Sequence, residues 1–460
     1  MTISTLDVAH ILIALTIVLL AAHLVGGVFA ALRQPPVIGE IVGGLLLGPT
    51  ALGALAPGLQ HRLFPDTGSV STVLNGIYQL GQLLLMFLAG AELRQAARGR
   101  AEQRAAGFIA VVGIAVPFTA GVALMQLVDY RSLAGPHGSA VTITLVFSIA
   151  VAVTSIPVIS RIMLDIGIMD TALARVVLTV AVVEDIVLYL VLAVVLGIAQ
   201  AHSNDSFGIS ASLGARSIPE MTAYYVVASV VFFAVMGSVG ARVFRWLTRL
   251  PYNVIERRYP AAMRLLFLLA VTLCCVALGI NPIFGALIAG LAATRGDSQA
   301  DAADSTRKDL ARIGWDSIRQ FSLAFFIPLF FAIVGLKLDL IHQFDIVFFC
   351  WFLVFACAVK SLSVWVAARL AGESRLSANR FAVAMNARGG PGIVLATVTL
   401  AAGVVNAQFF TAIVVLSIVT SEIAGVWLGR AFGRVAPHSA VSPTALAPTA
   451  KPALGADSGG

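Results

Sequence analysis

Apolar runs long enough to cross a bilayer follow one another along nearly the whole chain of 460 residues. The hydrocarbon core of a bilayer requires about 20 consecutive apolar residues per helix. We therefore expect thirteen transmembrane helices, at 8–31, 37–56, 75–93, 105–128, 139–163, 171–200, 220–243, 262–279, 281–294, 318–337, 344–368, 379–402 and 407–430. Only 12% of the residues are charged, against about 25% in soluble domains. The sequence thus predicts an all-α polytopic membrane protein.

The positive charges are distributed unequally between the two sides that these thirteen helices imply. If the N-terminus lies outside, 24 of the 30 Lys and Arg residues fall inside, 4 fall outside and 2 lie at membrane depth. Since cytoplasmic loops are enriched in Lys and Arg, we expect a multi-pass protein of the cytoplasmic membrane with the N-terminus outside and the C-terminus inside. The Pro-, Ala-, Ser- and Gly-rich stretch 435–460 is expected to be a disordered cytoplasmic tail.

Composition and motifs argue against several kinds of partner. The net charge of +7 is spread over loop arginines, which does not favour binding to nucleic acid. No Gly-rich phosphate-binding motif follows a strand, so we expect no nucleotide, and any transport must draw on an ion gradient. The four cysteines lie inside apolar runs without the spacing of a zinc site, so we expect no cofactor and no resident metal.

Two adjacent carboxylates, Glu184 and Asp185, lie about halfway along the apolar run 171–200. Ionisable residues at membrane depth are costly unless paired or hydrated, and they are typical of functional sites. Two like charges in a low dielectric do not both stay ionised without a cation nearby, so one is expected to hold a proton or to find a basic partner. Lys360, in the middle of 344–368, is the candidate partner of either carboxylate. A proton and a Na⁺ or K⁺ ion would compete for such a pair.

Two of the expected helices carry helix-breaking residues at membrane depth. In 139–163, Pro157 removes a backbone donor, and Thr154 and Ser155 can bond the freed groups. In 379–402, we expect four residues not to remain regular helix, namely Gly389, Gly390, Pro391 and Gly392. If helices 1–6 and 8–13 form two repeats of opposite orientation, the breaks fall in the fifth member of each. Matched breaks in inverted repeats are typical of a midplane ion site in secondary transporters.

Arg388 lies beside Asn386 in the second break. We expect its guanidinium to neutralise the C-terminal ends of the crossing half-helices as a fixed charge, in preference to a catalytic role. Two functions other than cation exchange remain open on these residues. One is proton-coupled export of an organic solute, and the other is a membrane enzyme or sensor with Glu184 and Asp185 as an acid/base pair. A ligand-sized pocket beside the carboxylates would favour the enzyme, but we expect a transporter and not an enzyme.

Several segments resemble, in the same order, those of cation/proton antiporters of the Na⁺(K⁺)/H⁺ exchanger superfamily, in the branch of bacterial sodium/proton antiporters and potassium-efflux systems. They read RQPPVIGEIVGGLLLGPTALG, LLLMFLAGAEL, SIAVAVTSIPVISRIMLDIGIMDTALARVVLTVAVVEDIVL, GINPIFGALIAGLA, FFIPLFFAIVGLKLDL, and VKSLSVWVAARLAG with MNARGG beyond it. The resemblance covers nearly the whole membrane part of the chain. It implies exchange of a monovalent cation, Na⁺ or K⁺, for protons.

The resemblance also implies roles for individual residues. Asp185 matches the ion-binding, proton-carrying aspartate of the family, and Lys360 matches the lysine that pairs with the preceding carboxylate when the ion is absent. Thr154 and Ser155 match the unwound crossing. At the position before Asp185, the Glu184 side chain is longer than the Asp that is usual there. The stoichiometry of exchange, one or two protons per cation, therefore stays open. The stretch GGPGIV also lacks a Glu that many relatives place there, which bears on cation choice or gating.

The family fold implies a division of the exchanger domain 1–434. A core of about 105–200 and 344–430 would hold the crossing broken helices, and a dimerisation part would comprise about 8–93 and 262–337. A linker helix at about 220–243 would join the repeats. The resemblance further implies homodimers in the lipid bilayer that work by an elevator motion of the core.

Overall fold

Helices are the main secondary structure in the part of the chain that the structure, a computed structural model, describes. That part comprises residues 4–32, 34–65, 67–92, 99–169, 171–201, 218–250, 253–298 and 305–432. Within it the only β pairing is an isolated antiparallel bridge between Ala134 and Val405. The expected all-α class is therefore confirmed. The tail 435–460, expected to be disordered, lies outside the described residues.

The elements alternate between long helices and short ones. The first half contains α1 (Thr5–Ala31), α2 (Pro36–Leu47), the π-helical turn η1 (Pro49–Gly53), α3 (Pro57–Leu63), α4 (Ser69–Glu92), α5 (Gly99–Met125), the 3-10 turn η2 (Tyr130–Ser132), α6 (Ala140–Ala152), α7 (Ile156–Ile166) and α8 (Ala172–Ala201). The second half contains α10 (Ile218–Arg249), α11 (Val254–Arg258), α12 (Pro260–Ala277), α13 (Pro282–Ser298), α14 (Ser305–Phe321), the π-helical turn η3 (Ser322–Phe326), α15 (Ile327–Leu336), α16 (Ile346–Leu370), α17 (Arg375–Ala384), α18 (Gly389–Ala401) and α19 (Ala407–Ala431).

In the described residues, ten helices are long and apolar enough to cross a membrane. The three other expected spans are built from shorter helices: α6 with α7, α13, and α17 with α18. The total of thirteen spans therefore stays a prediction. One expected start differs, because the helix expected from 318 is preceded by the amphipathic α14, which begins at Ser305. Charged residues interrupt its apolar stripe, and a search for apolar runs passes over such a helix.

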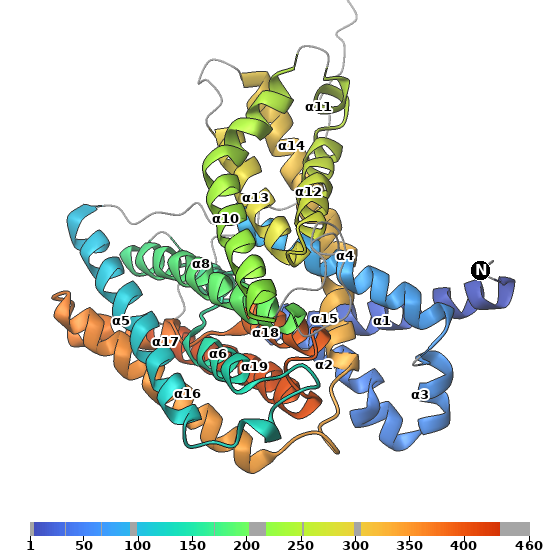
Figure 1. Ribbon diagram of the computed structural model, residues 1–460, viewed down its shortest axis with the longest axis horizontal. Helices are drawn as coiled ribbons and strands as arrows, with labels where there is room; N and C mark the ends of the chain where they lie inside the picture. The colour runs from blue at the N-terminus through green and yellow to red at the C-terminus, as the bar shows by residue number, and fades with distance from the viewer. Residues whose placement is uncertain are drawn as a thin grey trace, which may run out of the picture.

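Close helix contacts build the framework around the site. Figure 1 shows α10 to α14 together at the top of the view, with α5, α16 and α17 at its lower left. At the contact of α4 with α13, a Cβ on Gly90 would lie 1.9 Å from the backbone oxygen of Leu287. In the same contact, a Cβ on Gly290 would lie 2.0 Å from the oxygen of Phe87. The two backbones thus approach as closely as only glycine permits.

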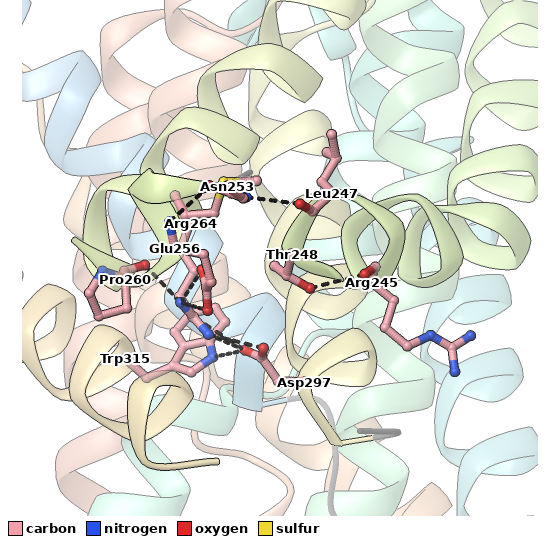
Figure 2. Close-up of polar contacts among 10 residues, drawn as sticks. Arg245, Leu247, Thr248, Asn253, Glu256, Pro260, Arg264, Asp297 and Trp315 are labelled. Carbon is pink, nitrogen blue, oxygen red and sulfur yellow. Dashed lines mark hydrogen bonds and ion pairs between the residues drawn. The ribbon is translucent and has the colours of Figure 1, made fainter. Parts of the chain in front are cut away.

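A buried arginine joins the helices at the top of that view. Arg264 on α12 is fully buried and forms ion pairs with Asp297 on α13 at 3.0 Å and Glu256 on α11 at 3.3 Å (Figure 2). The indole of Trp315 on α14 donates to Asp297 at 2.9 Å. Its ring stacks on that of Phe87, with centroids 5.1 Å apart. This cluster links α11, α12, α13 and α14 to α4.

Candidate ion-binding site

The two broken helices lie against each other at the middle of the core. Helix α6 ends at Ala152 and α7 begins at Ile156, while α17 ends at Ala384 and α18 begins at Gly389. The hydroxyl of Thr154 donates to the backbone oxygen of Met385 at 2.7 Å. The backbone N–H of Ser155 donates to the oxygen of Ala387 at 2.6 Å. Each break therefore satisfies backbone groups that the other leaves without a helical partner.

The first break contains Thr154 and Ser155 and the second contains Asn386 and Arg388, while the expected proline and glycines follow the breaks. Pro157 lies in the first turn of α7, and the non-helical residues are 153–155. The expectation that Gly389, Gly390, Pro391 and Gly392 interrupt the helix is wrong, because these residues form the first turn of α18, and the break is at 385–388. A proline in a first helical turn loses no hydrogen bond, since the N–H groups there have no intrahelical acceptor.

The glycines of this turn serve close packing. A Cβ on Gly392 would lie 2.2 Å from the hydroxyl oxygen of Ser417 on α19. Gly389 has a positive φ of 33°, and a Cβ there would lie 2.2 Å from a methyl group of Val158 on α7. The glycines thus let the start of α18 touch both α7 and α19.

Arg388 is buried and its five donors all find acceptors. Nε donates to the oxygen of Ala150 at 3.0 Å, and Nη2 donates to the oxygens of Val151 at 3.0 Å and Ala356 at 2.9 Å. Nη1 lies 3.2 Å from the amide oxygen of Asn386 and 3.3 Å from its backbone oxygen. Two of these carbonyls are in the last turn of α6, whose end carries partial negative charge. The arrangement suits a fixed structural cation.

Lys360 on α16 meets Glu184 on α8. Its Nζ lies 2.6 Å from Oε1 of Glu184, and both side chains are fully buried. Nζ also donates to the oxygens of Ala152 at 2.5 Å and Gly113 at 3.1 Å. An ammonium has three donors, so Lys360 is saturated. Of the two carboxylates that the sequence offered, the structure places Glu184 against the lysine.

Asp185 is the carboxylate without such a partner. Its side chain is buried, yet its Oδ1 has no hydrogen-bond partner among the described residues. The same holds, within that part of the chain, for Oε2 of Glu184. A buried ionised oxygen without a partner is costly, so these oxygens need either a proton or a cation. They are therefore candidate binding positions for a proton or a cation.

The two hydroxyls of the first break differ in the lone pairs that they have left. Ser155 Oγ accepts from the N–H of Gly390 at 3.2 Å and of Val158 at 3.4 Å. Thr154 uses its hydrogen on Met385, and its oxygen keeps lone pairs that a cation can share. Ser155 therefore joins the starts of α18 and α7, and Thr154 is the better candidate ligand.

Sequence reasoning missed Ser421 on α19, whose hydroxyl accepts from the N–H of Gly389 at 3.1 Å. It also donates to the backbone oxygen of Ser417 at 2.7 Å, one turn earlier. Its only sequence signal is a polar residue within an apolar run. The fold turns that residue toward the start of α18, where it satisfies one of the first N–H groups of the half-helix.

A surface hollow of about 330 Å³ lies away from this site. Its lining comprises residues 342–345 and 406–408. Neither Glu184 nor Asp185 is among them, so this hollow is not the pocket beside the two carboxylates that would favour a membrane enzyme.

Crossing half-helices around a buried carboxylate pair define a secondary ion transporter. The transmembrane model of the sodium/hydrogen exchangers matches residues 15–433, so the chain belongs to the sodium/hydrogen exchanger family. It is thus a multi-pass membrane protein and a monovalent cation/proton antiporter, and its family is one of transporters.

Several known proteins are similar over most of the chain. The Na⁺/H⁺ antiporter NhaS4 of Synechocystis sp. is 29% identical over 90% of this chain and 95% of its own length. The Na⁺/H⁺-K⁺ antiporter GerN of Bacillus cereus is 27% identical over 91% of this chain and 95% of its own length. K⁺/H⁺ antiporter 1 of Saccharomyces cerevisiae is 28% identical, but the match spans only 44% of that longer protein.

A solved structure shares the fold. The sodium proton antiporter MjNhaP1 of Methanocaldococcus jannaschii superposes with a TM-score of 0.57 at 14% sequence identity. The match covers 92% of this chain and 98% of the other. The antiporter fold expected from the sequence is therefore confirmed.

Proposed function

We propose that this protein exchanges Na⁺ or K⁺ for protons at Asp185. The carrying observation is that Glu184 is engaged by Lys360, while Oδ1 of the neighbouring Asp185 has no partner in the described part of the chain. A single buried carboxylate that binds either a proton or a cation couples the two movements, because the two ligands compete for the same oxygens. Thr154 adds a neutral oxygen donor from the crossing.

In this proposal Lys360 holds Glu184 in the cation-free state. A cation that enters beside both carboxylates weakens the pull of Lys360 on Glu184, since it offers the same oxygens a second positive charge. If Glu184 and Lys360 exchange protons during the cycle, two protons move per cation. If they remain a static pair, one proton moves. Arg388 keeps its charge throughout, because all its donors are engaged with backbone and amide oxygens.

The names of similar proteins support either Na⁺ or K⁺ as the cation that is exchanged. NhaS4 is a Na⁺/H⁺ antiporter and the yeast relative a K⁺/H⁺ antiporter. Export of an organic solute and an enzyme or sensor role are less favoured, because the family is one of cation antiporters. Hard monovalent cations also suit an all-oxygen site of two carboxylates and a hydroxyl.

We further propose that the protein lies in the cytoplasmic membrane with the N-terminus outside. The unequal distribution of Lys and Arg supports this orientation. The site helices α5 to α8 and α16 to α19 would form the moving core, α1 to α4 and α12 to α15 would form the part through which two copies pair, and α10 would link the repeats. The outer face of α1 supports pairing or lipid contact, since Leu12 and Leu24 on it are exposed.

The test is cation-driven proton movement in vesicles. Inverted membrane vesicles carrying the full chain are given a pH gradient, and its collapse is followed after addition of Na⁺, K⁺ or Li⁺. We expect at least one cation to collapse the gradient in wild type and none to do so in Asp185→Asn. The matched control is Asp316→Asn, which changes an exposed carboxylate on α14 and should leave exchange unchanged.

Two results would contradict the proposal. The first is full exchange in Asp185→Asn, which would place the ion elsewhere. The second is no response to any cation from wild-type protein whose folding and insertion have been verified. That outcome would favour organic-solute export instead.

A further inference from the structure

Helix α4 contacts α13 and η3 on one side and the site helices α8 and α18 on another. It packs closely against α13 through Gly90, and a Cβ on Gly81 would lie 2.6 Å from the backbone oxygen of Phe326 in η3. Such close backbone contacts leave no room for α4 to slide against α13 or η3. Another strip of α4, one helical turn long, carries Gln82 and Met86 toward α18 and α8. These two contacts are made by side chains alone.

The first contact is a buried hydrogen bond between α4 and α18. The amide of Gln82 donates to the hydroxyl oxygen of Thr397 on α18 at 3.0 Å. Each residue is 3% exposed. The hydroxyl of Thr397 in turn donates to the oxygen of Val394 in its own helix, also at 3.0 Å. The side chain of Tyr78, one turn before Gln82 on α4, also hydrogen-bonds that of Thr397. Such a buried polar cluster gives one arrangement of α4 and α18 a defined register.

The second contact lies next to the ion site. Tyr189 follows Asp185 by one helical turn on α8, so both lie on the same side of that helix. Its hydroxyl approaches the sulfur of Met86 at 3.6 Å, and its ring meets Phe284 of α13 edge-on with centroids 6.4 Å apart. All three side chains are buried. Together they close the boundary between α4, α13 and α8 beside Asp185.

We propose that Gln82 and Thr397 form a latch that holds α4 against the site helices in the conformation seen here, and that this latch must open in each transport cycle. The proposal rests on the exchange at Asp185 proposed above. When the latch opens, the layer of Met86, Tyr189 and Phe284 separates and one side of the membrane gains access to Asp185. Gln82 and Thr397 are thus positioning residues that set how often the site changes sides.

The chemistry of the pair predicts unequal effects for its two partners. Gln82→Leu removes the donor, and the hydroxyl of Thr397 keeps its bond to Val394 and its side-chain hydrogen bond with Tyr78. Thr397→Val instead leaves the Gln82 amide buried without its acceptor, which penalises the closed state more because opening lets water reach the amide. The closed state should therefore weaken about fivefold in Gln82→Leu, and more in Thr397→Val. The double variant should weaken the closed state less than Thr397→Val alone, since no stranded amide remains and only the hydrogen bond between Tyr78 and Thr397 is lost in addition to the latch.

Access to the site can be measured without transport. The reporter is Asp185→Cys in a full chain whose four native cysteines are alanine, labelled by a membrane-impermeant thiol reagent in right-side-out and in inverted vesicles. We expect both latch variants to raise the labelling rate from one side of the membrane only. The control is Thr399→Val on the same helix, because its buried hydroxyl donates to the oxygens of Leu395 and Ala396 within α18 and, in the described part of the chain, to no other helix.

A second readout uses chains that retain Asp185. Latch variants should change the apparent KM for the cation and the turnover rate together, while the pH at which protons inhibit exchange stays unchanged. The latch proposal would be overturned if the reporter chain were labelled at the same rate, from either side, with and without Gln82→Leu or Thr397→Val. An equally large effect of Thr399→Val would also overturn it. The labelling result stands even if no exchange is found, so failure of the latch and failure of the proposed function are distinguishable.

Discussion

The buried pair of Lys360 and Glu184 makes a quantitative prediction about stability. Lys360→Met removes the only cation that contacts Glu184 in the described residues and also removes donors from the oxygens of Ala152 and Gly113. Removal of one partner of a buried ion pair costs about 3–5 kcal/mol. Because both side chains are fully buried, solvent does not screen the pair. We therefore expect the upper part of that range.

The opposite change should cost less. Glu184→Gln keeps an oxygen where Oε1 accepts from Nζ, so Lys360 retains three acceptors and loses only the opposite charge. We expect a cost of about 1–2 kcal/mol, the difference between a charged and a neutral hydrogen bond. In the double variant no charge of the pair remains, so its cost should fall below the sum of the single costs by about 2 kcal/mol.

The assay is thermal unfolding of the purified protein in detergent, at one scan rate because such transitions are often irreversible. A change of 1 kcal/mol shifts Tm by about 2–4 °C in domains of 150–250 residues and by less in longer chains. We expect a fall of roughly 5 °C for Lys360→Met. The control is Lys337→Met, an exposed lysine whose Nζ lies 4.2 Å from the ring centroid of Tyr78. An unchanged Tm in Lys360→Met, or strictly additive single effects, would refute the reasoning.

Three further predictions concern the exchange, the crossing and the framework. Since protons and cations compete at Asp185, lowering the pH should raise the apparent KM for the cation, by about tenfold per pH unit once the site is mostly protonated, with the maximal rate unchanged; initial rates in proteoliposomes measure this, and a KM independent of pH would contradict it. Arg388→Lys should lower Tm, since three donors replace five and the two lost hydrogen bonds to a charged group are worth about 3–6 kcal/mol; an unchanged Tm would show that the guanidinium geometry is not required. Gly290→Ala should cost about 1–3 kcal/mol because its Cβ would lie 2.0 Å from the oxygen of Phe87; Gly237→Ala, with nothing within 4 Å of its Cβ, is the matched control and should leave Tm near that of wild type.

Much of the fold follows from the bilayer as a solvent. A chain in hydrocarbon must satisfy its backbone within helices, so long apolar runs predict where most membrane helices lie. The amphipathic α14 was not predicted over its whole length, because its charged residues resemble a loop in a search for apolar runs. The two breaks were recognised from proline and glycine, yet Pro157 and the glycines from Gly389 on follow the non-helical residues, which are 153–155 and 385–388. Proline and glycine also suit the first turn of a helix, and only the hydrogen bonds of the crossing distinguish the two cases.

The sequence by itself determined which groups are chemically unusual. Glu184, Asp185 and Lys360 stand out because charge at membrane depth has a cost that must be offset. The charged residues by themselves left open which carboxylate the lysine meets, and only the family resemblance pointed to Glu184. Tertiary structure decided this, since Lys360 and Glu184 are 176 residues apart and meet only when α16 packs near α8. The same packing leaves Oδ1 of Asp185 without a partner in the described chain. Periodicity within one helix carries no information on such contacts, because they depend on how separate helices approach one another.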